Sequence, residues 1–267
     1  MKVYRNLPEI QRKERLGRRF SLTGLAILFL GMMSSFIPNW YPTPESATTE
    51  LARTLQLYWP YFSFFALPAG FVCASIGSYY INRFARRRWP GRKLIERPDE
   101  VLERTLKGMD DKYALFLWSL PQASQVLVGP CGILTFATRS DKGRVQAHGD
   151  KWREPFSIGR IFTVFAREGV GNPRQEIEEQ ANKLRQFLGQ YESEVALTDI
   201  PIDGAVVFLN DEVELDLQNP SAAALRSDQV KTFVREKARQ VKLQTSMLRA
   251  VTRYLEEHSN YTTVEEE

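Results

Sequence analysis

Two long stretches without a charged residue constrain the fold of this chain more than any other feature. The first runs from Phe20 to Pro44 and the second from Thr54 to Asn82. The apolar core of a bilayer is about 30 Å thick, so a helix needs roughly 20 residues to cross it. Both stretches reach that length. We therefore predict a transmembrane hairpin over residues 20–82, with spans at about 20–38 and 56–81.

Aromatic residues close both stretches. Trp40 and Tyr41 follow the first, and Tyr79 and Tyr80 end the second. Amphipathic rings favour the membrane–water interface, so we expect these four side chains to anchor the helix ends. The second stretch also contains two prolines, which membrane spans tolerate because neighbouring groups satisfy the freed carbonyls. The competing interpretation is a pair of helices buried in the core of a soluble domain.

The distribution of charge predicts the orientation of the hairpin. Residues 1–93 carry 14 Lys and Arg against 4 Asp and Glu, whereas the remainder has a net charge of −6. All but one of the basic residues lie in a tail at 1–19 and a juxtamembrane linker at 83–94; the loop that joins the spans has only Arg53, beside Glu45 and Glu50. Such residues stay in the cytoplasm. We predict a multi-pass protein of the cell membrane with both termini cytoplasmic; a cleaved signal peptide is the competing interpretation of the first stretch.

Small residues recur at helical spacing inside both stretches. Gly24 and Gly31 lie seven residues apart in the first, and Gly70, Ala74 and Gly77 follow one another in the second. Small side chains let helix backbones approach closely in lipid, so these positions are expected to face one another. Neither stretch contains a carboxylate, amine or guanidinium, which indicates an anchor in the lipid bilayer rather than a transport pathway.

The pattern after the linker is that of a soluble α/β domain over residues 95–240. Amphipathic periodicity indicates helices, and short apolar runs bounded by Gly and Pro indicate strands. The expected order is a helix at 99–109, strands at 125–128, 132–138 and 144–147, a helix at 175–188, a strand at 204–209, a long helix at 228–257 and an acidic tail at 258–267. This order predicts a three-layer α/β sandwich.

Several of these elements resemble a known family. They are Val128–Leu134 (VGPCGIL), then Gly143 and Trp152, then Asn172–Gln175 (NPRQ), and finally Val206–Asn210 (VVFLN). In this order and spacing they resemble the NERD (nuclease-related) domain over roughly residues 95–240. The resemblance implies a restriction-endonuclease-like fold of the PD-(D/E)XK kind.

The resemblance also implies a site for phosphodiester cleavage, and this chain departs from it. In the family, a divalent cation is held by a carboxylate on one strand and by an acid-X-Lys pair on the next. The first acid falls here on Ser124 or Gln125, and the acid-X-Lys on Ala137-Thr138-Arg139. The helix glutamine is retained as Gln175. Without the carboxylates Mg²⁺ loses its main ligands, so we expect a pseudoenzyme that holds no metal and no other cofactor.

Relocated acids are the alternative, and they would make the chain a membrane-tethered, Mg²⁺-dependent nuclease. The candidates are Asp99, Glu100 and Glu103 on the leading helix, and Asp141, Asp150 and Glu154 near the strands. Solvated surface acids are the simpler interpretation. Arg139 and Arg144, with Arg160 and Gln175, are instead candidates for a residual phosphate-binding patch, because guanidinium pairs bidentately with phosphate.

Other chemistries find little support in the sequence. The only histidines are His148 and His258, and the only cysteines are Cys73 and Cys131, so no zinc-binding spacing exists. Cys131 is expected to pack as a small apolar residue rather than act as a nucleophile. Asn172 is expected to cap the helix that Pro173 opens.

The last expected helix carries a seven-residue apolar repeat: Val234, Val241, Leu248 and Leu255. Such a repeat favours helix–helix packing, so Met247–Leu255 is the expected contact for a second copy or a protein partner. The alternative is that this face covers the sheet of its own domain.

Together these features predict an anchored NERD-like domain that serves binding or scaffolding at the membrane. An accessory subunit of a membrane complex is a further alternative, and nucleic acid is a weaker candidate partner.

Overall fold

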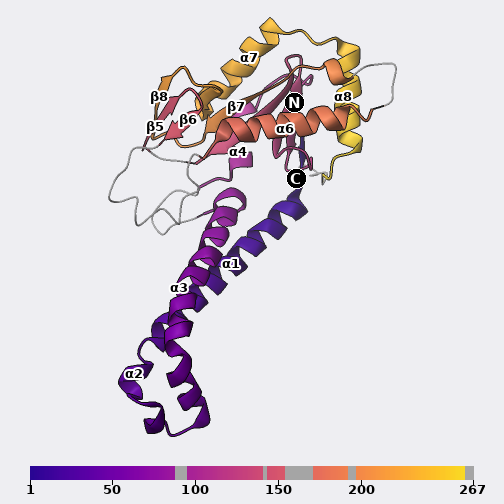
Figure 1. The fold of residues 1–267 in the computed structure, drawn as a ribbon. Coiled ribbons are helices and arrows are strands. Elements are labelled where there is room, and N and C mark those ends of the chain that lie inside the picture. Colours follow the sequence, from indigo (N-terminus) through magenta and orange to yellow (C-terminus); the bar gives the residue numbers. More distant parts are fainter. Residues whose placement is uncertain (88–94, 141–142, 154–170, 192–196, 262–267) are drawn as a thin grey trace. The chain divides into compact units, whose positions relative to one another are not determined.

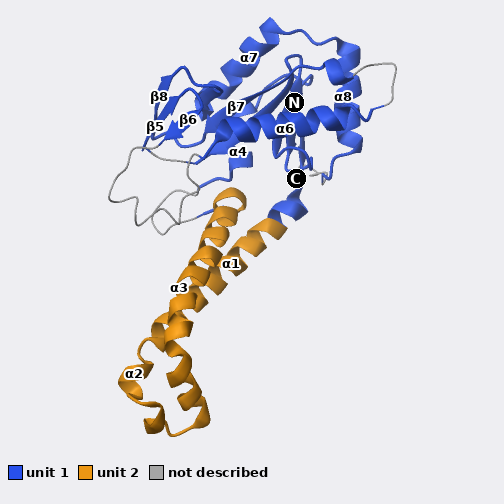
Figure 2. Ribbon diagram, in the orientation of Figure 1, with its two compact units in different colours: residues 1–11, 86–158, 168–267 blue, residues 12–85, 159–167 orange. Residues whose placement is uncertain are grey.

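A computed structural model describes residues 1–87, 95–140, 143–153, 171–191 and 197–261. The chain divides into two compact units (Figure 2). Residues 12–85 form the helix unit. Residues 1–11 and the described residues from 86 onward form the α/β unit. The asymmetry between an apolar first third and a mixed remainder is therefore matched by a division of the fold.

The helix unit is built on two long helices, α1 (Leu7–Ser34), whose first turn belongs to the α/β unit, and α3 (Glu50–Phe84) (Figure 1). A short helix α2 (Ile37–Trp40) and a 3-10 turn η1 (Pro44–Ser46) connect them. The Thr49 side chain caps α3 by accepting a hydrogen bond from the backbone N–H of Ala52 at 3.2 Å. Both long helices are long and apolar enough to cross a membrane, judged by length and composition.

Glycine lets the two long helices touch along their length. A Cβ added at Gly24 would lie 2.6 Å from the backbone nitrogen of Ala74, and one at Gly31 would lie 2.5 Å from the Cβ of Ala66. A Cβ added at Gly77 would lie 2.4 Å from the backbone nitrogen of Ser21. Later residues of α1 meet earlier residues of α3, so the helices run antiparallel. The expected role of these small residues in close packing is confirmed.

The α/β unit is centred on a mixed six-stranded sheet in the order β1-β2-β3-β4-β7-β9. Its strands are β1 (Lys2–Arg5), β2 (Ala114–Leu117), β3 (Gln125–Gly129), β4 (Gly132–Arg139), β7 (Ile202–Phe208) and β9 (Ala223–Arg226). β3 runs antiparallel to both neighbours, and the remaining pairs are parallel. The turn from β3 to β4 requires glycine at Gly132, which has φ +90° and leaves no room for a Cβ beside the carbonyl of Pro201.

Helices cover both faces of this sheet, as the fully apolar strands require (Figure 1). One face packs against α6 (Pro173–Leu188) and α8 (Thr245–Glu257), through strand residues such as Phe116. The other packs against α4 (Pro98–Leu106) and α7 (Val230–Gln240), through residues such as Leu117. Alternation along β2 thus sends successive side chains into different cores. The mixed α/β fold with three layers agrees with the sequence.

The strand expected at 144–147, which could have extended the main sheet, lies instead in a second, three-stranded sheet. β5 (Gly143–His148), β6 (Lys151–Arg153) and β8 (Val213–Gln218) form their own sheet in the order β6-β5-β8. The strand predicted at 144–147 exists but does not continue the main sheet, because its partners are β6 and β8. A small core that includes Val145, Trp152 and Phe208 joins the two sheets, with the rings of Trp152 and Phe208 stacked at 6.4 Å.

The interpretation of residues 1–19 as a tail is wrong. Residues 2–5 form the edge strand β1, which pairs in parallel with β2, and the chain then enters α1. Tyr4 is buried and stacks on Phe116 at 4.7 Å between ring centroids. The segment is basic, but its alternation of an apolar residue with polar neighbours suits the exposed edge of a sheet.

The single long helix predicted at 228–257 is also wrong. The chain leaves the helical conformation at 241–244, where the Leu243 N–H donates to the Pro130 carbonyl at 2.9 Å. Val234 on α7 belongs to one core, whereas Leu248 and Leu255 on α8 belong to the core on the opposite face. The break carries the chain from one face of the sheet to the other. Val234, Leu248 and Leu255 of the apolar repeat are therefore buried within their own unit, and half-buried Val241 lies in the break, so the repeat forms no continuous exposed stripe.

Candidate functional site

Ser124, Ala137 and Arg139, three of the positions implied by the nuclease resemblance, lie on one face of the sheet. Val126 of β3 pairs with Thr135 of β4, and continuing this register by two residues places Ser124 opposite Ala137. Directly opposed residues of an antiparallel pair point to the same side. Ala137 is fully buried and packs in the core that contains Ile177 of α6. Where the resemblance implies two carboxylates, this chain thus has a hydroxyl and a methyl group.

Arg139 lies at the end of β4 on this same face and pairs with a carboxylate. Its guanidinium donates to Glu176 of α6 at 2.6 Å, although the Arg139 side chain is only 5% exposed. The amide of Gln180, one helical turn later, donates to the other oxygen of Glu176 at 3.3 Å. The buried cation is therefore balanced by a carboxylate of its own unit, which weakens its attraction for an external phosphate.

Two buried glutamines leave hydrogen-bonding capacity unused within the described residues. The Oε1 of Gln180 is buried without a partner there, and both amide atoms of Gln125 are buried without one. By strand alternation Gln125 points with Leu127 to the face covered by α4, away from Arg139. Gln125 and Ser124, the two alternatives for the missing first acid, thus face opposite sides of the sheet.

The other residues expected in a binding patch lie elsewhere. Gln175 is exposed on α6, where its amide donates to Glu179 at 2.9 Å, so the helix turns Glu176 and Gln180 toward β4 instead. Arg144 lies on β5 of the three-stranded sheet and binds Asp216 at 2.7 Å. Arg160 lies outside the described residues. The patch of Arg139, Arg144 and Gln175 is not assembled as one constellation by any contact among the described residues.

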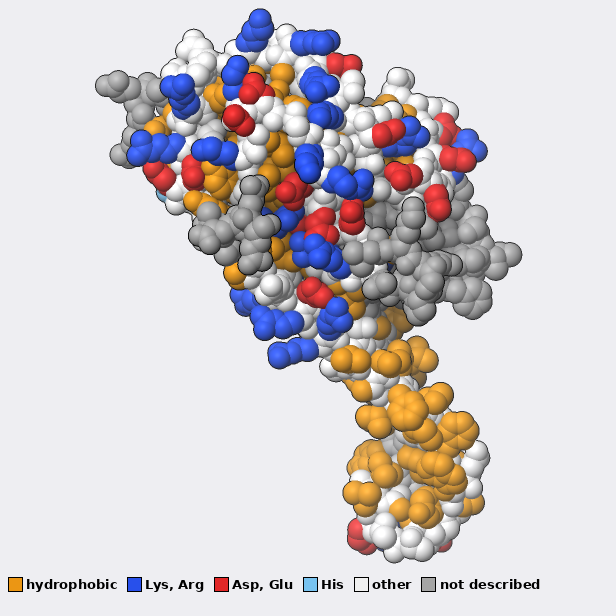
Figure 3. All heavy atoms as spheres, turned by 180° about the vertical axis from the view of Figure 1, so that it is seen from behind, with side chains coloured by type: hydrophobic (Ala, Val, Ile, Leu, Met, Phe, Trp, Pro, Cys, Tyr) orange, Lys and Arg blue, Asp and Glu red, His pale blue; other side chains and the backbone are white. Residues whose placement is uncertain are grey.

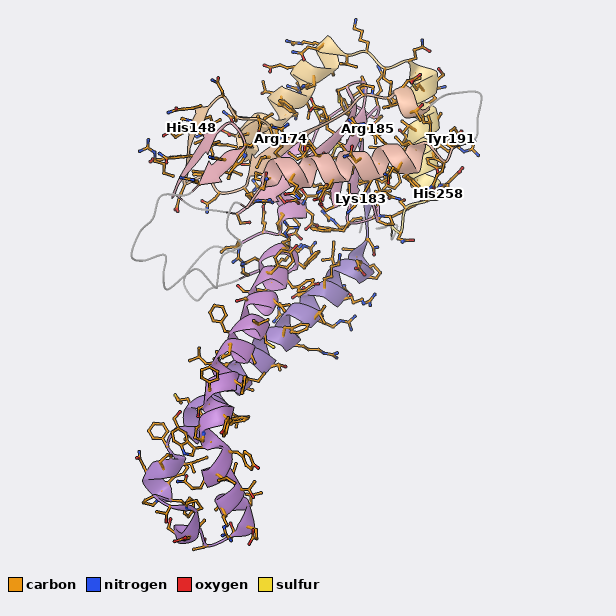
Figure 4. The ribbon with its side chains drawn as sticks, viewed as in Figure 1. His148, Arg174, Lys183, Arg185, Tyr191 and His258 are labelled. Carbon is orange, nitrogen blue, oxygen red and sulfur yellow. The ribbon has the colours of Figure 1, made fainter. Side chains whose placement is uncertain are left out.

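The acids considered for a relocated metal site are also dispersed. Asp150 forms an ion pair with Arg174, which Figure 4 labels at the start of α6. Asp141 and Glu154 lie outside the described residues. Among the residues that the structure describes, no group of three or more His, Cys, Asp or Glu side chains is arranged to hold a metal ion.

Asp99 of α4 is instead part of a buried ion cluster. Its carboxylate is fully buried and lies 3.0 Å from Arg5 and 3.1 Å from Arg97. Burial raises the pKa of the Asp99 carboxyl, and the guanidiniums of Arg97 and Arg5 counteract that rise. A carboxylate enclosed by two cations in this way is an anchoring group rather than a free metal ligand.

The same helix holds the two segments of chain that lead to the helix unit. Arg5, two residues before α1, also binds Glu103 at 2.5 Å. Arg86, two residues after α3, binds Glu100 at 2.6 Å. Burial alone would raise the pKa of Glu100, but the hydrogen bond from Arg86 and those from Arg97 outweigh it, so the pKa is lowered. The first turn of α4 is therefore the common attachment point of both connections.

The cysteine and histidines show no catalytic arrangement. Cys131 is buried, and burial raises the pKa of its thiol to about 11, which opposes nucleophilic chemistry. His148 lies on β5 and His258 follows α8, on different elements (Figure 4). His258 packs against Tyr254 at 4.4 Å and Phe187 at 5.5 Å between ring centroids. The expectation that Cys131 packs as an apolar residue agrees with its burial.

The helix unit presents a different kind of surface. Large apolar side chains point outward along α1 and α3, among them Leu22 at 68% exposure and Phe64 at 72%. Figure 3 shows hydrophobic side chains crowding this segment, with charged residues largely confined elsewhere. Of the aromatic residues expected at interfaces, Trp40 is 61% and Tyr79 40% exposed, Tyr41 follows α2, and Tyr80 packs against Phe84 at 6.0 Å between ring centroids.

Sequence reasoning missed Glu176 and Gln180 as the neighbours of Arg139. The sequence did contain a signal for these two residues, because Glu176 and Gln180 lie next to the apolar stripe of α6 that begins at Pro173 and Ile177. A polar residue inside such a stripe must find a partner on the covered face.

No protein-family model matches this chain, and neither a curated protein nor a solved structure shows significant similarity to it.

Proposed function

We propose that this protein is a membrane-anchored, catalytically inactive, nuclease-related (NERD-like) domain that serves binding or scaffolding at the cytoplasmic face of a cell membrane. In this proposal α1 and α3 form a transmembrane hairpin, and the α/β unit has the restriction-endonuclease-like fold. The order of helix, strands, helix, strand and helix supports that fold. A protein partner and self-association are part of the proposal, through surfaces other than the apolar repeat of α8.

The observation that carries the membrane anchor is the inverted distribution of apolar side chains in the helix unit. Large residues such as Leu22 and Phe64 point outward, whereas the contact between the helices is made by glycine and alanine. A helix in the core of a soluble protein would bury its large side chains. Exposed apolar surface of this extent needs an apolar solvent, and helix pairs in lipid use small residues at their contact.

The orientation rests on charge, and labelling with an impermeant thiol reagent tests it. A Thr48→Cys variant should be labelled in intact cells, because residue 48 lies in the loop opposite the basic flanks. Its matched control is Ile95→Cys, an exposed position beyond α3, which should be labelled only after the membrane is permeabilised. The unmodified protein corrects for Cys73 and Cys131. Labelling of residue 95 in intact cells, or partition of the protein into the soluble fraction, contradicts the proposal.

Catalytic inactivity is supported by Ser124 and Ala137 in the places of the two acids and by the pairing of Arg139 with Glu176. Purified full-length protein in detergent should not cleave DNA or RNA with Mg²⁺ or Mn²⁺ above a buffer control. Affinity purification in mild detergent with quantitative identification of bound proteins tests the scaffolding part, with an Arg139→Ala variant beside the native chain. If cleaved nucleic acid is recovered with the protein and no protein partner is bound in stoichiometric amount, the scaffolding part of the proposal is refuted.

One observation favours a second candidate, a membrane-tethered metal-dependent nuclease. Glu176 places a carboxylate beside Arg139 at 2.6 Å, on the face of the sheet where the resemblance implies a metal. A single carboxylate is a poor site for Mg²⁺, which is bound through one or two carboxylates together with substrate phosphates. This alternative requires cleavage that disappears in a Glu176→Gln variant. Metal-dependent cleavage that survives Glu176→Gln assigns the acid elsewhere.

A further inference from the structure

One end of the helix unit carries a band of positive charge. Residues 12–20 and 78–85 contain six Lys and Arg and a single acid, Glu14. The cations of this basic collar are Arg12, Lys13, Arg15, Arg18, Arg19 and Arg83. The opposite end of the helix pair, residues 43–53, has Glu45, Glu50 and one cation, Arg53. The two ends of the apolar segment therefore differ in net charge by six, +5 against −1.

Three cations of the collar are held by contacts of two kinds. Lys13 lies over the ring of Phe84 and Arg83 over the ring of Tyr79, each at 5.0 Å from the centroid. Arg18 is paired with Glu14 at 2.7 Å. These contacts keep charge beside the aromatic residues that end α3, at the margin of the apolar surface.

Arg15 and Arg19 are different, because they are exposed and have no carboxylate partner among the described residues. They lie four residues apart, so their side chains leave α1 on the same side, separated by about 6 Å along the helix axis. Two guanidiniums at this spacing can each present a planar pair of donors to an anionic group.

We propose that the basic collar binds the headgroups of anionic phospholipids, with Arg15 and Arg19 as the principal contacts. This inference rests on the proposed membrane anchor, because residues that border a membrane-spanning segment lie at the depth of the headgroups. Guanidinium binds phosphate bidentately, and juxtamembrane cations add attraction for lipids with net negative charge. The occupant is a lipid rather than a soluble anion because the collar borders the exposed apolar surface of α1 and α3.

The test compares phosphatidylglycerol with phosphatidylcholine, which share the phosphate but differ in net charge. Full-length protein in mild detergent is titrated with each lipid, and bound lipid is counted by native mass spectrometry. We expect tighter binding of phosphatidylglycerol. The Arg15→Gln/Arg19→Gln variant should lose about 25-fold in affinity for phosphatidylglycerol, about fivefold per arginine, and keep its affinity for phosphatidylcholine.

The matched control is Arg53→Gln/Arg249→Gln, which removes the same charge at exposed positions outside the collar and should leave both affinities unchanged. Equal binding of the two lipids, or an unchanged preference in the collar variant, overturns the inference. Displacement of phosphatidylglycerol by millimolar inorganic phosphate also overturns it, because it would show a general anion site. Circular dichroism confirms that the variants are folded. A protein that binds neither lipid and stays soluble without detergent refutes the membrane anchor itself.

Discussion

The two units of this protein place their large apolar side chains in opposite positions. In the α/β unit, Phe116, Phe136 and Phe208 are at most 1% exposed. In the helix unit, Phe64 and Leu67 are 72% and 66% exposed, whereas Gly24 and Gly77 fill the contact between helices. Burial of apolar area from water stabilises the first arrangement, but that driving force is missing between helices in lipid. The difference is the one expected if the helix unit, as proposed, lies in lipid and the α/β unit in water.

The largest effect should come from a charge placed in the core of the α/β unit. Leu255 is fully buried, so Leu255→Asp should cost about 4 kcal/mol or more in folding free energy, because an unpaired carboxylate would be desolvated. Loss of folded α/β signal by near-ultraviolet circular dichroism and sensitivity to protease are the measurements. A folded variant would mean that α8 is dispensable to its own core and would restore its apolar repeat as a candidate interface. Arg253→Asp, at an exposed position of α8, is the control.

The next effect tests the comparison of phenylalanines directly. Phe136→Ala should lower the free energy of unfolding by about 3–5 kcal/mol, because it opens a cavity in a close-packed core. Phe64→Ala removes the same side chain from an exposed position and should change it by less than about 0.5 kcal/mol. Urea unfolding of the full-length protein in detergent measures both. Equal losses would show that Phe64 is buried against something, and the contrast between the units would fail.

A smaller effect is expected from bulk added between the two long helices. Gly24→Leu should destabilise the helix unit by about 1–3 kcal/mol, because its side chain would meet the backbone of α3 at Ala74. Ala26→Leu adds a side chain of the same size on the exposed side of α1 and should be neutral. Thermal unfolding in detergent compares the two variants. If both variants unfold at the same temperature, close contact at Gly24 does not hold the two helices together.

The smallest effects concern the charges of α4, and their signs differ. The raised pKa of Asp99 means that its ionised form disfavours folding; this cost is absent below the ordinary value of 3.8 and appears as pH rises through the folded pKa. The lowered pKa of Glu100 means that its stabilisation is present above 4.5 and is lost as pH falls through the folded pKa.

Asp99→Asn should therefore gain stability relative to the native chain as pH rises above 3.8, whereas Glu100→Gln should lose stability relative to it as pH rises toward 4.5 and then show no further change. Urea midpoints measured across this range give both slopes. Parallel slopes for the two variants would contradict the division between a buried and a half-buried carboxyl on α4.

Local sequence patterns predicted the central elements well. The strands expected at 125–128 and 132–138 correspond to β3 and β4, and the helix expected at 175–188 corresponds to α6, with Asn172 capping it through the backbone N–H of Gln175. Strand β2 and edge strands such as β1 and β9 were missed, because four residues are too few to establish a period. The partners of Arg139 were missed because the phase of α6 relative to β4 depends on packing.

The sequence alone determined which segments are apolar, how long they are and where the charges flank them, because composition and periodicity are local properties. It also showed Ser124 and Ala137 at the positions where the resemblance to the nuclease-related family implies acids. Only the tertiary structure decided that residues 2–5 complete the sheet, that the last helix breaks at 241–244 to reach the opposite face, and that Glu176 neutralises Arg139. These outcomes depend on contacts between residues far apart in the chain, and no local pattern encodes which distant surface remains to be covered.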